Sequence, residues 1–309
     1  MNSSWEKYMK LGIIHFMIYP EVMKGEGPII ETLGKILSDE FFMAVEVTRM
    51  KDDNVREQAK KMLEVSHIAT AYGAQPVLLV NKLNINSLND AERVNAVNEV
   101  KKCIDEASYL GAKGVAILSG QHPGADKEKE AVEQLKKSLR ELCGYAKKYN
   151  LNFELESFDF DIDKKCLVGK SDLAAEIAKE IRKDYDNFGL ILDLSHFPIQ
   201  YEATKTALKN CAKYLTHLHI GNCAMKDKSH SAYGDQHPRF GISGGENDVK
   251  ELKEFFEVLF DIGFLKEVKD ESQLPIISFE VKPLAGESSE LVMANAKRVM
   301  KLAWAAIAG

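Results

Sequence analysis

Eight short apolar segments alternate with longer amphipathic segments along the chain, and this alternation restricts the fold more than any other feature of the sequence. The apolar segments carry few charges, which is typical of strands that are buried on both faces of a parallel sheet. We expect these strands at residues 11–17, 41–47, 76–80, 114–119, 151–157, 188–195, 215–221 and 275–281.

Helical patterns occupy the segments between the expected strands. In residues 89–110, Val97, Val100 and Ile104 recur on one stripe, and Gly111 follows as a stop signal. The other helices are expected at residues 27–38, 53–72, 127–149, 170–183, 202–213, 246–262 and 288–307. Eight strand–helix units predict an α/β fold, a single (β/α)8 TIM-barrel domain that spans residues 1–309.

The main alternative architecture is an open, doubly wound sheet. That fold usually carries a glycine-rich phosphate-binding turn after its first strand, and the segment that follows residue 11 has none. The one long irregular connection, residues 222–245, follows the seventh strand and is rich in glycine, histidine and charge. Because long connections in compact domains are often functional, we predict a lid loop there.

Composition restricts the partners and the compartment. The chain has 41 Lys and Arg residues against 47 Asp and Glu residues, so it lacks the basic surface expected of a nucleic-acid-binding protein. We see no signal peptide, and no apolar run approaches the roughly 18 residues that a membrane-spanning helix needs. The five cysteines show no CxxC spacing. These features predict a cytoplasmic enzyme with a small-molecule substrate.

Ionisable residues stand near the ends of the last four expected strands. They are Glu156, Asp193, His219 and Glu280. A barrel gathers such strand ends at one mouth, where three carboxylates repel one another unless a cation separates them. A single Glu or Asp at a strand end would more often be a helix cap or an ion-pair partner, and a single His would more often be a core residue with a hydrogen-bond partner. Together they predict a site for one divalent ion, Mn, Mg, Co or Zn.

Other polar residues on the strands have more than one interpretation. Glu154 is expected to face the barrel interior as a partner of Lys282 or of His217. His217 is expected to be a core residue or to orient the ligand histidine that follows it. Glu46 and His15 could line a substrate pocket, and structural pairing explains them about as well.

The motif Asp193-Leu-Ser-His196, together with the other three strand-end residues, resembles a known pattern. It is similar to that of the xylose isomerase-like superfamily of TIM barrels, in particular the sugar isomerase/epimerase branch that includes D-tagatose 3-epimerase. The resemblance implies that Glu156, Asp193, His219 and Glu280 hold the metal. It also implies that Glu156 and Glu280 act as the acid/base pair through an enediolate.

The resemblance extends to the substrate site, where the match is incomplete. It implies that His196 contacts a substrate hydroxyl. The additional Glu and Arg of the epimerases have no direct counterpart in the segments 157–165 and 222–228. Asp159, Asp161 or Asp163 and Lys226 or Lys228 could replace them. We therefore expect the family's chemistry to be kept and the substrate to differ.

Asp235 and His237 form a D-x-H pair within the expected lid. In endonuclease IV, a more distant relative with three zinc ions, a D-x-H pair joins the D-x-x-H histidine to hold one zinc. The resemblance therefore makes His196, Asp235 and His237 candidate ligands for a second ion, although contact with sugar hydroxyls is the interpretation we favour. The full set of predicted substrate contacts is His196, His122, Asp235, His237, Lys282 and Arg239.

These observations predict a metal-dependent sugar isomerase or epimerase that acts on a ketose or keto-sugar. Three alternatives stay open. They are a lyase or dehydratase acting on an inosose or oxidised glycoside, an endonuclease IV-like phosphodiesterase, and a barrel subunit that depends on a partner. The resemblance also implies a homodimer or homotetramer, and the composition predicts no membrane or nucleic-acid partner.

Overall fold

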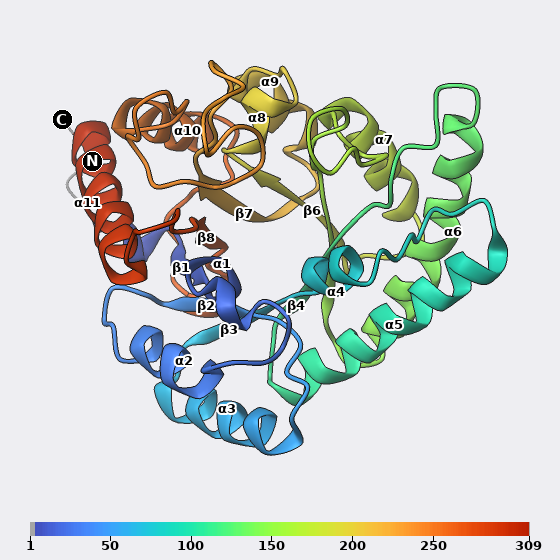
Figure 1. Ribbon diagram of the computed structural model, residues 1–309, viewed down its shortest axis with the longest axis horizontal. Coiled ribbons are helices and arrows are strands. Elements are labelled where there is room, and N and C mark those ends of the chain that lie inside the picture. Colours follow the sequence, from blue (N-terminus) through green and yellow to red (C-terminus); the bar gives the residue numbers. More distant parts are fainter. Residues whose placement is uncertain (1–3, 309) are drawn as a thin grey trace.

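Eight parallel strands pair in chain order, and the last pairs with the first, so the sheet closes into a barrel (Figure 1). This computed structural model describes residues 4–308. The strands are β1 (Lys10–Ile14), β2 (Ala44–Val47), β3 (Ala69–Gly73), β4 (Gly114–Leu118), β5 (Asn152–Glu156), β6 (Phe188–Asp193), β7 (Leu215–Gly221) and β8 (Ile276–Glu280). The predicted (β/α)8 barrel is therefore confirmed.

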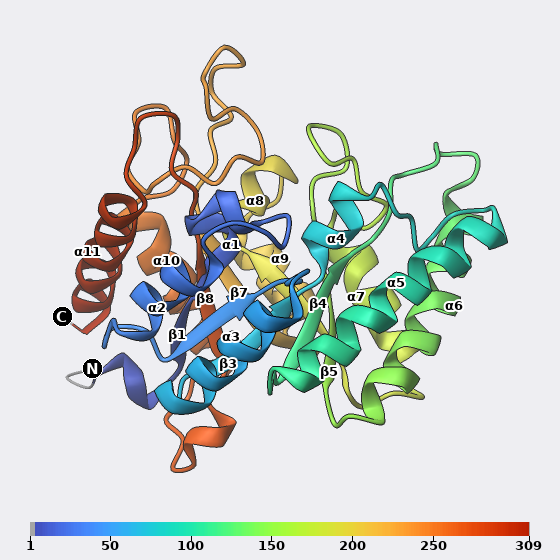
Figure 2. The ribbon, with the colours of Figure 1, turned by 60° about the horizontal axis from the view of Figure 1, so that its bottom comes forward.

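Helices surround the barrel and bury its outer face (Figures 1 and 2). The longer ones are α2 (Ile29–Leu37), α3 (Asp53–Ser66), α5 (Asp90–Tyr109), α6 (Glu128–Lys147), α7 (Ser171–Ile181), α9 (Thr204–Cys211), α10 (Val249–Asp261) and α11 (Ser289–Ala308). The short helices are α1 (His15–Ile18), α4 (Gln75–Val80), α8 (His196–Ile199), η1 (Trp5–Lys7), η2 (Pro20–Val22) and η3 (Glu271–Gln273).

The third strand was predicted in the wrong place. Residues 76–80 form most of α4, and β3 lies earlier, at Ala69–Gly73, within the expected helix 53–72. Helix α3 ends because His67 adopts a left-handed conformation, with φ of 58°. Pro76 stands in the first turn of α4, where proline is well tolerated. The apolar run 76–80 therefore lies in a short helix that contacts β4 and α5, instead of contributing a strand to the barrel.

The first two strands are shorter than expected. The predicted strand 11–17 ends at Ile14, and the chain turns into α1 at His15. The predicted strand 41–47 begins as β2 at Ala44. Phe41 and Phe42 instead pack near Phe279 of β8, with ring centroids 6.5 and 6.3 Å from it. Aromatic packing explains why this apolar segment extends beyond the strand.

The connections that follow the strands gather at one end of the barrel. Figure 2 shows them at the top, with the segment after β7 standing above the barrel. That segment includes residues 222–245, and its role as a lid stays a prediction. Among residues 4–308, no helix is both long enough and apolar enough to cross a membrane.

Candidate metal centre

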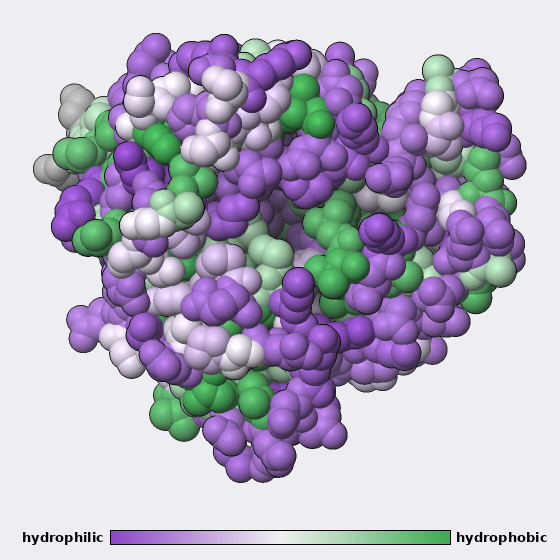
Figure 3. All heavy atoms as spheres, viewed as in Figure 1, coloured by the Kyte–Doolittle hydropathy of each residue, from purple (hydrophilic) through white to green (hydrophobic). Residues whose placement is uncertain are grey.

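The four strand-end residues predicted as metal ligands meet at one point. Glu156, Asp193 and Glu280 are the last residues of β5, β6 and β8, and His219 on β7 pairs in register with Asp193. One ligand atom from each of the four lies within 4.8 Å of the others. All four side chains are buried. Figure 3 shows that the face of the molecule turned to the viewer is hollowed near its centre.

His219 lies between two of the carboxylates. Its Nδ1 is 3.0 Å from Glu156 Oε1 and 2.9 Å from Glu280 Oε2. Burial opposes a charged imidazole, yet Glu46 and Glu156 raise the pKa of His219 well above its usual value. Burial raises the pKa of Asp193, and the charge of Glu280 adds to this effect. The centre thus combines buried negative charge with an imidazole that compensates for part of it.

Neighbouring groups hold two of the carboxylates in place. The Gln75 side chain donates from Nε2 to Glu156 Oε2 over 2.8 Å. The Ser195 backbone N–H and hydroxyl both donate to Asp193, each over 2.7 Å. Gln75 was not predicted as part of the site, because the neighbouring residues 76–80 were expected to form a strand. A glutamine directly before an N-terminal helical proline gave no sign of contact with β5.

The donor set fits a divalent cation. Three carboxylates and one imidazole nitrogen suit Mn, Mg, Co or Zn. The hydrogen bond of His219 Nδ1 goes to Glu156 Oε1, so the buried Glu280 Oε2 has no hydrogen-bond partner among the described residues despite its 2.9 Å contact with that nitrogen. An unsatisfied buried oxygen is costly unless another group binds it. A cation at this point would bind that oxygen and separate the three carboxylates. The residues present therefore match the metal that was predicted from the sequence.

A second group of polar side chains adjoins the first. His196, Asp235 and His237 are buried, with His196 Nε2 3.2 Å and His237 Nε2 2.7 Å from Asp235 Oδ1. One ligand atom each from Asp193, His196 and His237 also lies within 4.8 Å of the others. The Lys164 ammonium lies 3.0 Å from Asp235 Oδ2, so a cationic side chain already neutralises this carboxylate.

His196 bonds on both sides of its ring. Its Nδ1 lies 2.9 Å from the Ser157 carbonyl oxygen, to which it can only donate, and its Nε2 faces Asp235. Against the effect of burial, the charges of Asp235 and Asp193 raise the pKa of His196 to about 10. The protonated ring therefore lies between two carboxylates, those of Asp193 and Asp235.

The remaining predicted substrate contacts lie in different surroundings. His122 bonds to Glu128 over 3.0 Å, and Arg239 bonds to Glu287 over 2.9 Å. Lys282 is partly buried and donates to Gln236 over 3.0 Å. Burial and the nearby Lys164 charge lower the pKa of Lys282. No described contact joins His122 or Arg239 to the four candidate ligands.

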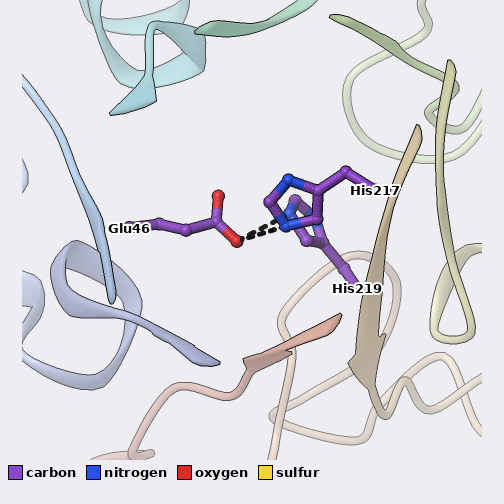
Figure 4. A group of neighbouring side chains, drawn as sticks. All are labelled: Glu46, His217 and His219. Atoms are coloured by element: carbon purple, nitrogen blue, oxygen red, sulfur yellow. Dashed lines mark ion pairs between the residues drawn. The ribbon is translucent and has the colours of Figure 1, made fainter. Parts of the chain in front are cut away.

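The inner polar residues pair within the barrel. His217 Nε2 lies 2.9 Å from Glu46 Oε1, and His217 Nδ1 lies 3.7 Å from Glu154 Oε2 (Figure 4 shows the Glu46 contact). Of the two partners considered for Glu154, the contact is therefore with His217. His15 bonds to the Thr32 hydroxyl over 2.8 Å, so it has a structural partner.

Comparison with known families gives one extended match. A sequence family described as "Xylose isomerase-like TIM barrel" matches residues 38–289. No curated protein matches the chain in a sequence search.

Solved structures resemble the whole barrel. One titled a D-tagatose 3-epimerase-like protein has a TM-score of 0.73 and 18% identity, covering 97% of this chain and 100% of that one. The IolI protein with a bound zinc atom has a TM-score of 0.71 and 18% identity, covering 96% and 98%. D-psicose 3-epimerase from Clostridium cellulolyticum H10 has a TM-score of 0.66 and 20% identity, covering 97% of each. Likeness at this level of identity establishes the fold.

Proposed function

Because the chain belongs to the xylose isomerase-like TIM barrel family, we propose that it is a divalent-metal-dependent sugar isomerase or epimerase acting on a ketose or keto-sugar. The observation that carries this proposal is the convergence of four buried side chains, from Glu156, Asp193, His219 and Glu280, at the ends of adjacent strands. Three similar structures are titled 3-epimerases or epimerase-like, which supports the choice of reaction.

Two of the four residues also move protons in this proposal. Glu156 and Glu280 stand on β5 and β8, on either side of β6 and β7, so each can serve one face of a substrate carbon. One carboxylate removes the α-proton to give an enediolate, and the other returns a proton to the opposite face. When bound, the divalent cation polarises the adjacent carbonyl. Gln75 fixes one oxygen of Glu156 and so orients the other.

Side chains around the centre would bind the sugar. We place His196 beside a substrate hydroxyl, because its Nε2 lies 3.9 Å from Asp193 Oδ2 and can form hydrogen bonds. We place the Lys282 ammonium at the mouth, where it is partly buried and has no carboxylate within 4.0 Å among the described residues. His122 and Arg239 bond to glutamates elsewhere, so they have no part in this proposal.

One resident ion is the stoichiometry that we propose. A second ion at His196, Asp235 and His237 would have to compete with the Lys164 ammonium for Asp235. That competition distinguishes this site from the four-residue centre, where no lysine or arginine lies within 4.0 Å of a ligand carboxylate among the described residues.

The five cysteines are free and buried, in keeping with a reducing cytoplasm.

Proton exchange with solvent tests the function directly. Purified protein of known metal content is incubated in D2O with a panel of ketoses, and deuterium at the α-carbon is followed by NMR. We expect exchange with formation of an epimer or aldose–ketose isomer. Glu156→Gln and Glu280→Gln should each slow exchange by roughly 10²- to 10⁴-fold, because each removes an acid/base group.

The control is Glu128→Gln, which removes a carboxylate that bonds to His122 away from the centre. This variant should exchange at the rate of the unmodified protein. Exchange that persists in Glu156→Gln, or after exhaustive chelation, would contradict the proposal. Net elimination would identify a lyase, cleavage of abasic DNA would identify a phosphodiesterase, and turnover only with an added protein would identify a partner-dependent subunit.

A further inference from the structure

A buried carboxylate faces the side of His219 that points away from the candidate metal centre. Figure 4 shows the Glu46 side chain reaching from β2 across the barrel interior to His217 and His219 on β7. Glu46 Oε1 lies 3.2 Å from His219 Nε2 and 2.9 Å from His217 Nε2. All three side chains are at most 3% exposed.

The two ring nitrogens of His219 therefore face two different sets of carboxylates. Nδ1 faces Glu156 and Glu280 of the metal centre, and Nε2 faces Glu46. A neutral imidazole carries a proton on one nitrogen and a lone pair on the other, and a metal ion needs the lone pair. A carboxylate at Nε2 favours the proton there, so Nδ1, which bonds to Glu156 Oε1 in this structure, can present its lone pair to a cation.

The two histidines are the contacts that the structure gives for Glu46 Oε1. In the described part of the chain, this oxygen and the Nε2 atoms of His217 and His219 form no hydrogen bond of regular geometry, even with one another, so they are related by ion-pair distances alone. A buried carboxylate is costly unless a polar partner compensates for it. His217 supplies part of that compensation, since it lies between Glu46 and Glu154. The carboxylate is thus held in place by one histidine while it faces the other.

A second ion bound by Glu46, His217 and His219 is the competing interpretation, because one ligand atom from each lies within 4.8 Å of the others. Such an ion would take Nε2 of His219 while Nδ1 serves the four-residue centre. The ring would then lose both of its protons. The separations of 2.9 and 3.2 Å are ion-pair distances, and a carboxylate that faces two imidazoles needs no such loss.

We propose that Glu46 is a positioning residue, which accepts a hydrogen bond from Nε2 of His219 and thereby presents Nδ1 of that ring to the metal. This inference rests on the proposed function, because it assumes that His219 binds a cation. It goes beyond that function by assigning a role to a residue of β2, a strand that contributes none of the four ligands.

Metal affinity and ring protonation test the inference together. Isothermal titration of the metal-free protein with Mn²⁺ or Zn²⁺ gives the affinity and the number of ions. We expect Glu46→Leu to weaken binding by roughly 10- to 100-fold, the usual effect of removing a carboxylate behind a metal-binding histidine. Glu46→Gln keeps an acceptor oxygen and should lose less. The number of ions should not change.

The protonation state provides a readout that a loss of stability would not mimic. In zinc-loaded protein labelled with ¹⁵N-histidine, we expect NMR to show a proton on Nε2 of His219 that exchanges slowly with solvent, and faster exchange in Glu46→Leu. Thr48→Val is the matched control. Thr48 is similarly buried just beyond β2, but its hydroxyl bonds to the Gly73 carbonyl. This variant should keep the affinity of the unmodified protein.

Other results of these experiments would contradict either the role of Glu46 or the proposed function. Equal affinity in Glu46→Leu and the unmodified protein would overturn the positioning role alone. Loss of one of two bound ions in Glu46→Leu would also overturn it and would identify the group as an ion site. If the unmodified protein binds no divalent cation, the proposed function fails and this inference fails with it.

Discussion

At the scale of single residues, His15 is a buried histidine outside the metal centre. Its side chain is 2% exposed, and burial lowers its pKa to about 3. In the unfolded chain the same group has a pKa near 6.5. Below pH 6.5, His15 binds a proton in the unfolded state but stays neutral in the folded state. The free energy of unfolding should therefore fall as the pH falls from about 6.5.

Replacing His15 by Gln should remove this acid sensitivity. Between pH 7 and pH 5, we expect the free energy of unfolding of the unmodified protein to fall by about 2 kcal/mol relative to His15→Gln. Urea unfolding at several pH values measures the difference. His67→Asn, at an exposed helix end, is the control and should follow the unmodified protein. Parallel curves for the unmodified protein and His15→Gln would show that His15 accepts a proton in the folded state.

The sequence was most informative at residues whose place is set by topology. The strand-end positions of Glu156, Asp193 and Glu280 could be predicted to converge, because a parallel barrel brings all its strand ends to one mouth. Contacts across the barrel could not be predicted in the same way. Gln75 reaches Glu156 and Glu46 reaches His219 only because of side-chain directions that depend on the closed sheet.

At the scale of elements, the assignment of β3 shows the limit of hydrophobic patterns. Residues 76–80 are more apolar than the true strand, Ala69–Gly73, which consists of small and polar residues apart from Tyr72. Leu79 and Val80 are nevertheless 40% and 48% exposed in α4. The barrel as a whole could still be predicted, because the other apolar segments overlap observed strands and closure fixes where the missing strand must lie.

The loop after β5 is organised by one carboxylate. Asp159 is fully buried and accepts hydrogen bonds from the backbone N–H groups of residues 162–165, over 2.6 to 3.1 Å. This places the Lys164 ammonium between Asp163 and Asp235. Asp159 was considered as a replacement for the additional epimerase Glu, but its carboxylate oxygens are occupied by the loop backbone.

Asp159→Asn should loosen this loop. The amide replaces one accepting oxygen with a donor and removes the charge, so at least one backbone N–H loses a hydrogen bond to a charged group, at a cost of about 1–3 kcal/mol. Hydrogen–deuterium exchange measured by mass spectrometry should rise in residues 160–166. The control Asp161→Asn changes an exposed carboxylate of the same loop and should leave exchange there unchanged. Equal exchange in the two variants would contradict the role assigned to Asp159.

At the scale of the whole molecule, the candidate metal centre joins the ends of β5, β6, β7 and β8, half of the closed sheet. Without a cation, histidines are the only positively charged groups within 4.0 Å of the three buried carboxylates among the described residues, and Glu280 Oε2 is left without a hydrogen-bond partner. Such an arrangement lowers stability in exchange for a binding site. A cation should therefore stabilise the entire barrel, because binding to the folded state alone shifts the unfolding equilibrium.

We expect the melting temperature to rise with Mn²⁺ concentration and to fall again on chelation. At a free ion concentration of about 100 times Kd, the stabilisation is about 2.7 kcal/mol, which corresponds to an increase on the order of 5 °C.

Glu280→Gln should lose most of this increase in melting temperature. The same variant should be at least as stable as the unmodified protein when both are metal-free, because it removes one of the crowded charges. Calorimetry with and without the ion measures both effects. A metal-free Glu280→Gln protein that is much less stable than the unmodified one would show that Glu280 holds the fold together rather than a cation.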